Sequence, residues 1–121
     1  DCELLVFEIE EELRKNLEDE TGLEIYADAR TLPEVMKARG IDKAGLIVSS
    51  LPFTVLPRDV TKSVMDGVTR SLAPDGSFVA FQYSLHMKGT LEKLFDKVDV
   101  RFVMMNIPPA FVYECRGVKA R

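Results

Sequence analysis

Several residue types are scarce in this chain of 121 residues, and each scarcity excludes a class of protein. The two cysteines, Cys2 and Cys115, lie near opposite ends and provide neither a disulfide framework nor a set of zinc ligands. The single histidine, His86, has no nucleophile-elbow sequence to act with, which argues against hydrolase chemistry. No apolar run approaches the roughly 20 residues that span a bilayer. We therefore expect a soluble, cytoplasmic protein that binds no metal ion.

The composition indicates one globular domain, and the order of its apolar patterns indicates an α/β fold. The net charge of −4 argues against a dedicated nucleic-acid partner, because such binding needs a concentrated basic face. Short apolar runs alternate with helical patterns, which predicts a largely parallel sheet with two antiparallel edge strands at the C-terminal end. The predicted strands cover residues 4–7, 23–27, 46–48, 77–83, 98–104 and 111–115, and the predicted helices cover 10–21, 32–39, 58–72 and a short segment around 91–95, with a turn at 74–76.

Ligands of open α/β sheets bind beyond the carboxyl ends of the strands, so the residues at those ends are the first candidates. Glu8 follows the first predicted strand, where its carboxylate can accept hydrogen bonds from ribose hydroxyls; alternatively, it starts an acidic helix. Asp28 follows the second strand and can accept a hydrogen bond from an adenine amino group while the backbone N–H of Ala29 donates one. Alternatively, Asp28 caps a helix or turn. Taken alone, Glu8 and Asp28 each fit the structural role at least as well as the cofactor-binding role.

The segment Ser50-Leu51-Pro52-Phe53, after the third strand, is the more specific candidate for a catalytic site. Hydroxyl and carbonyl oxygens on a proline-stiffened segment can orient an amine, and an aromatic ring can cover the cation that develops on it. The alternative is an ordinary proline turn with Phe53 in the core. Tyr83, at the end of the next strand, can line the same pocket or serve as a half-buried packing residue.

Five motifs, taken in order, resemble those of the class I S-adenosylmethionine-dependent methyltransferases. They are Glu8-Ile9, Ala27-Asp28-Ala29, Ser49-Ser50-Leu51-Pro52-Phe53, Pro74-Asp75-Gly76 before Phe81-Gln82-Tyr83, and Asn106-Ile107-Pro108-Pro109-Ala110. Within that superfamily the chain is most similar to phospholipid N-methyltransferases and, more distantly, to ribosomal RNA adenine dimethylases. The likeness extends from Leu4 to Arg116.

The resemblance implies a Rossmann-like methyltransferase sheet and S-adenosylmethionine as cofactor. The cofactor-binding residues that it implies are Glu8 on the ribose, Ile9 on the adenine face, Asp28 and Ala29 on the adenine edge, and Ser49 near the methyl group. The catalytic residues that it implies are Ser50, Leu51, Pro52 and Phe53, which would hold the incoming nitrogen for in-line methyl transfer. The substrate-binding residues that it implies are Tyr83, Asn106, Pro108 and Pro109.

The sequence departs from the family's pattern in two places. The family has serine followed by glycine before Leu-Pro, whereas this chain has Ser49-Ser50. A serine at the second position allows fewer backbone conformations than the family's glycine. The family's first strand and Gly-rich loop should precede Leu4, and the glycines of this chain form no G-x-G. We therefore expect residues 1–121 to be the C-terminal two thirds of a single methyltransferase domain. A segment outside this sequence, or a second copy in a homo-oligomer, would then fill the position between the strands that end at Glu8 and Val48.

Three functions compete. The first is an N-methyltransferase that acts on a small amine or a phospholipid head group and is inactive as this chain alone; a lipid acceptor would favour peripheral contact with a membrane. The second is N6-methylation of RNA adenine, against which the acidic balance argues. The third is a non-catalytic, methyltransferase-like scaffold or oligomerisation module.

Overall fold

The structure is a computed structural model that describes residues 5–8, 11–49, 51, 53, 55–82, 84–103 and 110–119. The elements in chain order are β1 (Val6–Phe7), α1 (Glu11–Thr21), β2 (Ile25–Tyr26), the single 3₁₀ turn η1 (Ala29–Thr31), α2 (Leu32–Ala38), β3 (Ala44–Ser49), α3 (Arg58–Ser71), β4 (Leu72–Gln82), α4 (Lys88–Leu94), β5 (Phe95–Val103) and β6 (Ala110–Val118). Strands and helices alternate as far as β5, so the predicted α/β fold is confirmed.

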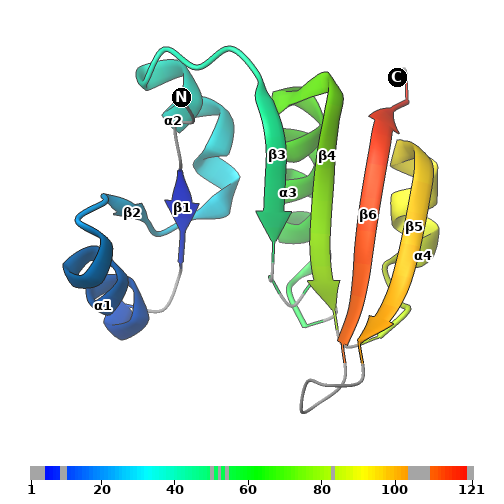
Figure 1. Ribbon diagram of the computed structural model, residues 1–121, viewed down its shortest axis with the longest axis horizontal. Helices are drawn as coiled ribbons and strands as arrows, with labels where there is room; N and C mark the ends of the chain where they lie inside the picture. Colours follow the sequence, from blue (N-terminus) through cyan, green and yellow to red (C-terminus); the bar gives the residue numbers. More distant parts are fainter. Residues whose placement is uncertain are drawn as a thin grey trace.

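The strands form two groups (Figure 1). β1 and β2 form a parallel pair, and the other four strands form a sheet in the order β3-β4-β6-β5. β3 and β4 are parallel, whereas β6 is antiparallel to both β4 and β5, as the sequence predicts. The prediction that both C-terminal strands lie at an edge is wrong for β6, which lies inside the sheet. Tyr113 and Cys115 on this strand are fully buried, as is typical of a strand that has another strand on each side of it in the sheet.

Helices α3 and α4 cover one face of the four-stranded sheet (Figure 1). The four-residue spacing of apolar side chains on α3 places Val64 and Val68 against the sheet, and both are buried. Phe78 of β4 and Phe95 of β5 stack beneath the helices, with ring centroids 6.0 Å apart. The hydrophobic core therefore lies between this helical layer and the sheet.

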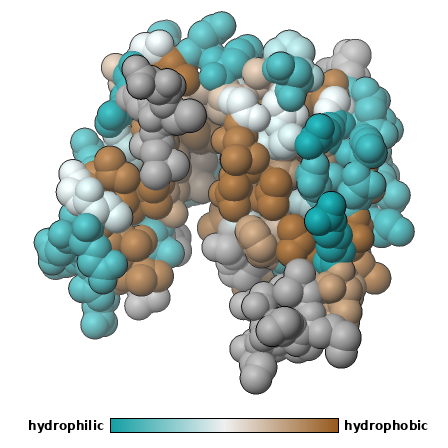
Figure 2. Space-filling model, viewed as in Figure 1, coloured by the Kyte–Doolittle hydropathy of each residue, from teal (hydrophilic) through white to brown (hydrophobic). Residues whose placement is uncertain are grey.

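The opposite face of the sheet is apolar along β3. Leu46 and Val48 are 60% and 57% exposed, and Val79 shares their face because it is the partner of Val48 in β4. Figure 2 shows apolar side chains gathered there, beside a hollow that separates this part from the β1–β2 part. None of the described helices covers these residues, and none of the described strands pairs with the free edge of β3.

The turn predicted at 74–76 is instead an irregularity inside β4. Ala44 pairs with Leu72, but Leu46 already pairs with Ser77, so the residues between Leu72 and Ser77 bulge out of register. Gly76 permits this close approach, because a Cβ atom there would lie 3.0 Å from the carbonyl oxygen of Ala44.

Candidate active site

The candidate site residues that the structure describes lie at the carboxyl ends of the strands. β1, β3 and β4 all run downward in Figure 1, and β2 runs parallel to β1. Glu8 follows β1, Asp28 follows β2, and Ser49 is the last residue of β3. The topology therefore brings these residues to one edge, which is where ligands of open α/β sheets bind.

Backbone hydrogen bonds fix the chain at Glu8. Its N–H donates to the carbonyl oxygen of Tyr26 at 2.7 Å, and its own carbonyl accepts from Nη1 of Arg14 at 3.4 Å. The rings of the preceding residue, Phe7, and of Tyr26 pack against each other, with their centroids 5.3 Å apart. Glu8 is half-buried at the end of a short parallel pair, and its role on a ribose stays a prediction. Ile9 lies outside the described residues.

The carboxylate of Asp28 caps the 3₁₀ turn η1. One oxygen accepts from the backbone N–H of Arg30 at 2.9 Å, and the other accepts from Nη2 of Arg30 at 2.7 Å. Hydrogen bonds from the side chain and backbone of Arg30 lower the pKa of Asp28, so the carboxylate is charged at neutral pH. The capping alternative is therefore confirmed. Adenine recognition by Asp28 and Ala29 stays a prediction, in which the adenine amino group would compete with the hydrogen bonds that Arg30 donates to both oxygens of this carboxylate.

The segment after β3 is tied to the end of β4. The hydroxyl of Ser49 accepts from the N–H of Leu51 at 3.1 Å, and the carbonyl of Leu51 accepts from the side-chain amide of Gln82 at 2.6 Å. That amide also donates to the carbonyl of Phe81 at 2.9 Å, and only 4% of Gln82 is exposed. No role was predicted for Gln82, although an amide at the end of an apolar strand is a signal for a buried donor.

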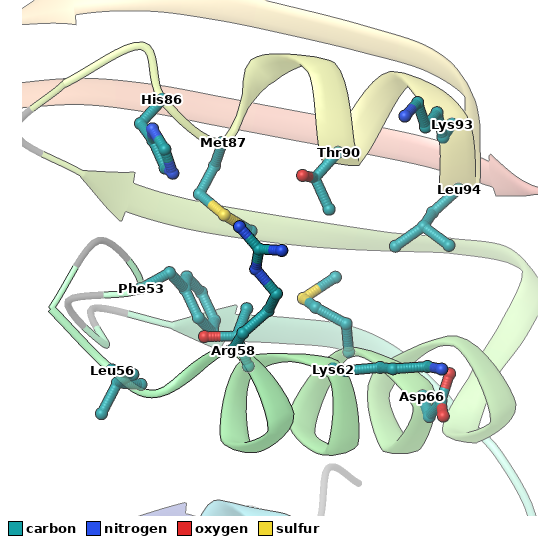
Figure 3. A pocket seen from close by; sticks show the side chains of 12 residues that line it. Phe53, Leu56, Arg58, Lys62, Asp66, His86, Met87, Thr90, Lys93 and Leu94 are labelled. Atoms are coloured by element: carbon teal, nitrogen blue, oxygen red, sulfur yellow. The ribbon is translucent and has the colours of Figure 1, made fainter.

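Phe53 belongs to the hydrophobic core. The residue is 4% exposed, and its ring lies beneath Met87 at a groove between α3 and α4 that Met65 also lines (Figure 3). The backbone N–H of Phe53 donates to the carbonyl of Leu51 at 2.9 Å, which closes a tight turn. The core alternative therefore describes this ring, and its role over an acceptor cation stays a prediction. Ser50 and Pro52 lie outside the described residues.

The segment after β4 is anchored by β6. The phenol of Tyr113 donates to the carbonyl of Ser84 at 2.9 Å, and burial raises the pKa of that phenol. The backbone N–H of His86 donates to the hydroxyl of Ser84 at 3.3 Å, so Ser84 does not face His86 as a nucleophile faces its base. The remaining predicted substrate residues, Tyr83, Asn106, Pro108 and Pro109, lie outside the described residues.

Large apolar side chains surround this edge of the sheet without being buried. Val55 follows β3 and is 76% exposed, Leu85 follows β4 and is 50% exposed, and Phe102 near the end of β5 is 52% exposed. We call Val55, Leu85 and Phe102 the apolar rim. Exposed apolar groups gathered at one edge typically mark an interaction surface.

Solved methyltransferase structures share this fold. An rRNA methylase from Streptococcus thermophilus superimposes with a TM-score of 0.62 over 93% of this chain and 72% of its own, at 13% identity. A putative methyltransferase from Streptococcus mutans, in complex with SAH, superimposes with a TM-score of 0.54 over 90% of this chain and 73% of its own, at 14% identity. The sheet is therefore the Rossmann-like sheet of the methyltransferases, as predicted.

The sequence itself is similar to a lipid-modifying enzyme. An ornithine lipid N-methyltransferase from Singulisphaera acidiphila is 30% identical over 98% of this chain, which spans 65% of that protein's length. No family model matches the chain. Taken with the fold, this similarity confirms the resemblance to the class I S-adenosylmethionine-dependent methyltransferases that is seen in the motifs.

Proposed function

We propose that this chain belongs to an S-adenosylmethionine-dependent N-methyltransferase whose acceptor is the amine of a lipid head group. The observation that carries the proposal is the similarity to an ornithine lipid N-methyltransferase along almost the whole chain. Among small amines and lipids, the similarity favours the lipid. The S. mutans neighbour, solved with SAH, supports the cofactor.

Bound S-adenosylmethionine would supply an activated methyl group. In this proposal Glu8 and Asp28, which follow β1 and β2, would hold the ribose and adenine of such a cofactor. Leu51, held at the end of β3 by Ser49 and Gln82, belongs to the segment that would orient the acceptor nitrogen. The cofactor would supply its methyl group to the acceptor nitrogen as the carbon–sulfur bond breaks, leaving S-adenosylhomocysteine, and the proton displaced from the nitrogen would pass to solvent. Alignment of the two reactants supplies most of the rate enhancement in this scheme.

Peripheral contact with a membrane would deliver the lipid. None of the described helices is long and apolar enough to cross a bilayer. The apolar rim offers another mode of contact, because exposed apolar side chains can enter the interfacial region while the rest of the protein stays outside. Val55 and Leu85 follow β3 and β4 and Phe102 lies near the end of β5, whereas Ser49 and Leu51 lie at the end of β3, so the head group would arrive where transfer takes place.

A second copy of the chain is part of this proposal. The exposed Leu46 and Val48 beside the free edge of β3 support a partner that pairs with this strand. Sedimentation velocity should show a dimer that Val48→Lys converts to a monomer. A monomer with the wild-type sequence would remove the homo-oligomer from the proposal.

Cofactor binding and methyl transfer test the function. Glu8→Gln should weaken binding of S-adenosylmethionine by about tenfold or more, because it removes the carboxylate that would accept from the ribose hydroxyls. The exposed Glu24→Gln is the matched control and should leave binding unchanged. Radiolabelled methyl groups should enter vesicles that contain phosphatidylethanolamine or ornithine lipid, and not an RNA hairpin. Labelling of the RNA instead would favour adenine methylation, and absence of cofactor binding by a protein that carries the family's first strand and Gly-rich loop ahead of this chain would favour the scaffold.

A further inference from the structure

A groove in the described part of the chain meets the predicted site only at Phe53. It has a volume of about 870 Å³ and runs between α3 and α4, on the helical side of the sheet (Figure 3). This volume falls in the range of about 300–1,000 Å³ that is typical of small-molecule sites. One end begins at Phe53 and His86, beside the segments that follow β3 and β4, and the other end reaches Leu94.

The floor of the groove is apolar and adaptable. Phe53, Met65 and Met87 form its base, and the half-buried Leu56 and Leu94 form its two ends. Methionine side chains adjust to ligands of irregular shape more easily than branched ones. A flexible hydrocarbon chain would find apolar contacts along this floor.

The sides of the groove carry positive charge. Arg58 and Lys62 come from α3 and Lys93 comes from α4, whereas Asp66 is the one carboxylate among the described lining residues. Figure 3 shows Arg58 extending from α3 toward Met87, and Lys62 beside Asp66. This local excess of cations contrasts with the net charge of −4 of the whole chain. The charge complements an anionic ligand.

We propose that the groove binds a single anionic amphiphile, with its hydrocarbon chain on the apolar floor and its phosphate or carboxylate attracted by the cations along the sides, of which Arg58 lies toward Met87 and Lys93 lies beside Leu94. An apolar floor beneath cations fits a lipid better than RNA, because successive bases stack on a series of exposed aromatic rings, whereas the ring of Phe53 is buried and the imidazole of His86 is the one exposed ring among the described lining residues. The site deepens the proposed function, since a lipid held here would lie beside the segment that presents the acceptor. It does not depend on cofactor binding.

Binding of dodecyl phosphate below its critical micelle concentration tests the site, measured by isothermal titration calorimetry without S-adenosylmethionine. The double variant Arg58→Gln/Lys93→Gln should weaken binding by about tenfold or more, because it removes two cations from the groove. The matched control is Lys97→Gln/Arg101→Gln, which makes the same change of charge on the opposite face of the sheet. Asp66→Asn should strengthen binding. Circular dichroism should show that all variants remain folded.

Three further ligands separate the contributions. Hexyl phosphate should bind at least about tenfold more weakly than dodecyl phosphate, because each buried methylene contributes to affinity. If inorganic phosphate binds as tightly as dodecyl phosphate, the groove is a site for anions alone. If dodecyl maltoside binds as tightly as dodecyl phosphate, the groove is an apolar cleft that does not recognise charge. Displacement of dodecyl phosphate by an RNA hairpin would assign the groove to nucleic acid. Each of these results, or an unchanged affinity in Arg58→Gln/Lys93→Gln, overturns the proposal.

The groove and the proposed function fail separately. A protein that methylates lipids but does not bind dodecyl phosphate through these cations refutes the groove alone. A protein that binds dodecyl phosphate as expected but does not bind S-adenosylmethionine refutes the methyltransferase activity alone.

Discussion

Replacement of Gln82 by methionine should loosen the segment after β3 and destabilise the fold. The side chains are similar in size, but methionine cannot donate the hydrogen bonds to the carbonyls of Leu51 and Phe81, which measure 2.6 and 2.9 Å. A neutral hydrogen bond contributes about 1 kcal/mol net, so the two together contribute about 2 kcal/mol. The Leu51 carbonyl keeps its bond from the N–H of Phe53, which argues against a larger loss.

Urea denaturation followed by circular dichroism measures this loss as a change in the free energy of unfolding. Faster hydrogen exchange at the amide of Phe53 would locate the effect, because this amide donates to the carbonyl that Gln82 holds. If Gln82→Met changes the free energy of unfolding by less than about 0.5 kcal/mol, the amide does not fix this segment and the reasoning is refuted.

Gln82→Glu supplies a control with a pH dependence. A protonated glutamate can still donate one hydrogen bond, whereas a carboxylate would face carbonyl oxygens in a site that is 4% exposed. Burial should therefore raise the folded-state pKa of Glu at this position above its unfolded value of about 4.3. Because the neutral form is the stabilised one, the variant should be closest to wild type below that value and should lose stability as the pH rises toward neutral.

Three further predictions concern stability and reactivity. Gly76→Ala should cost about 1–3 kcal/mol, because the added Cβ would lie 3.0 Å from the carbonyl oxygen of Ala44, whereas Gly89→Ala in α4 meets nothing within 4 Å and should stabilise the fold in the same urea assay. Burial raises the pKa of Cys115 to about 12, so peptide mapping should find this thiol unalkylated by iodoacetamide at pH 8 until urea is added. The free energy of unfolding should also fall as the pH rises above 9, because the thiol ionises there in the unfolded chain but not in the folded one. The hydroxyl of Thr61 is buried without a hydrogen-bond partner among the described residues, so Thr61→Val should raise the free energy of unfolding by about 1 kcal/mol, and a loss of that size would reveal a missed partner.

Elements with strong local signals could be predicted from the sequence. The four-residue apolar period of α3 fixed its bounds to within a residue, and Gly22 and Gly40, both at positive φ, follow the ends of α1 and α2 as expected. The place of β6 could not be predicted, because the order of strands in a sheet depends on pairing between distant segments. Pro74-Asp75-Gly76 predicts a turn, whereas the structure has a bulge before Ser77, because the sequence Pro-Asp-Gly is typical of both.

The candidate site shows the same division. Glu8 and Asp28 could be placed at strand ends because the strands themselves were recognisable. The hydrogen bond from Gln82 to Leu51 joins residues 31 positions apart, and no local pattern indicates it. Arg58 and Lys93 likewise come to one groove only when α3 and α4 pack side by side on the sheet.

The insertion of β6 between β4 and β5 affects how the protein can fold during synthesis. β5 leaves the ribosome before β6, yet in the described sheet it has no strand partner other than β6. The segment after β4 must likewise wait for Tyr113, which lies 29 residues further along the chain than Ser84. Because these contacts are non-local, the sheet and the site at its edge should form together, in one late step, once the final strand is available.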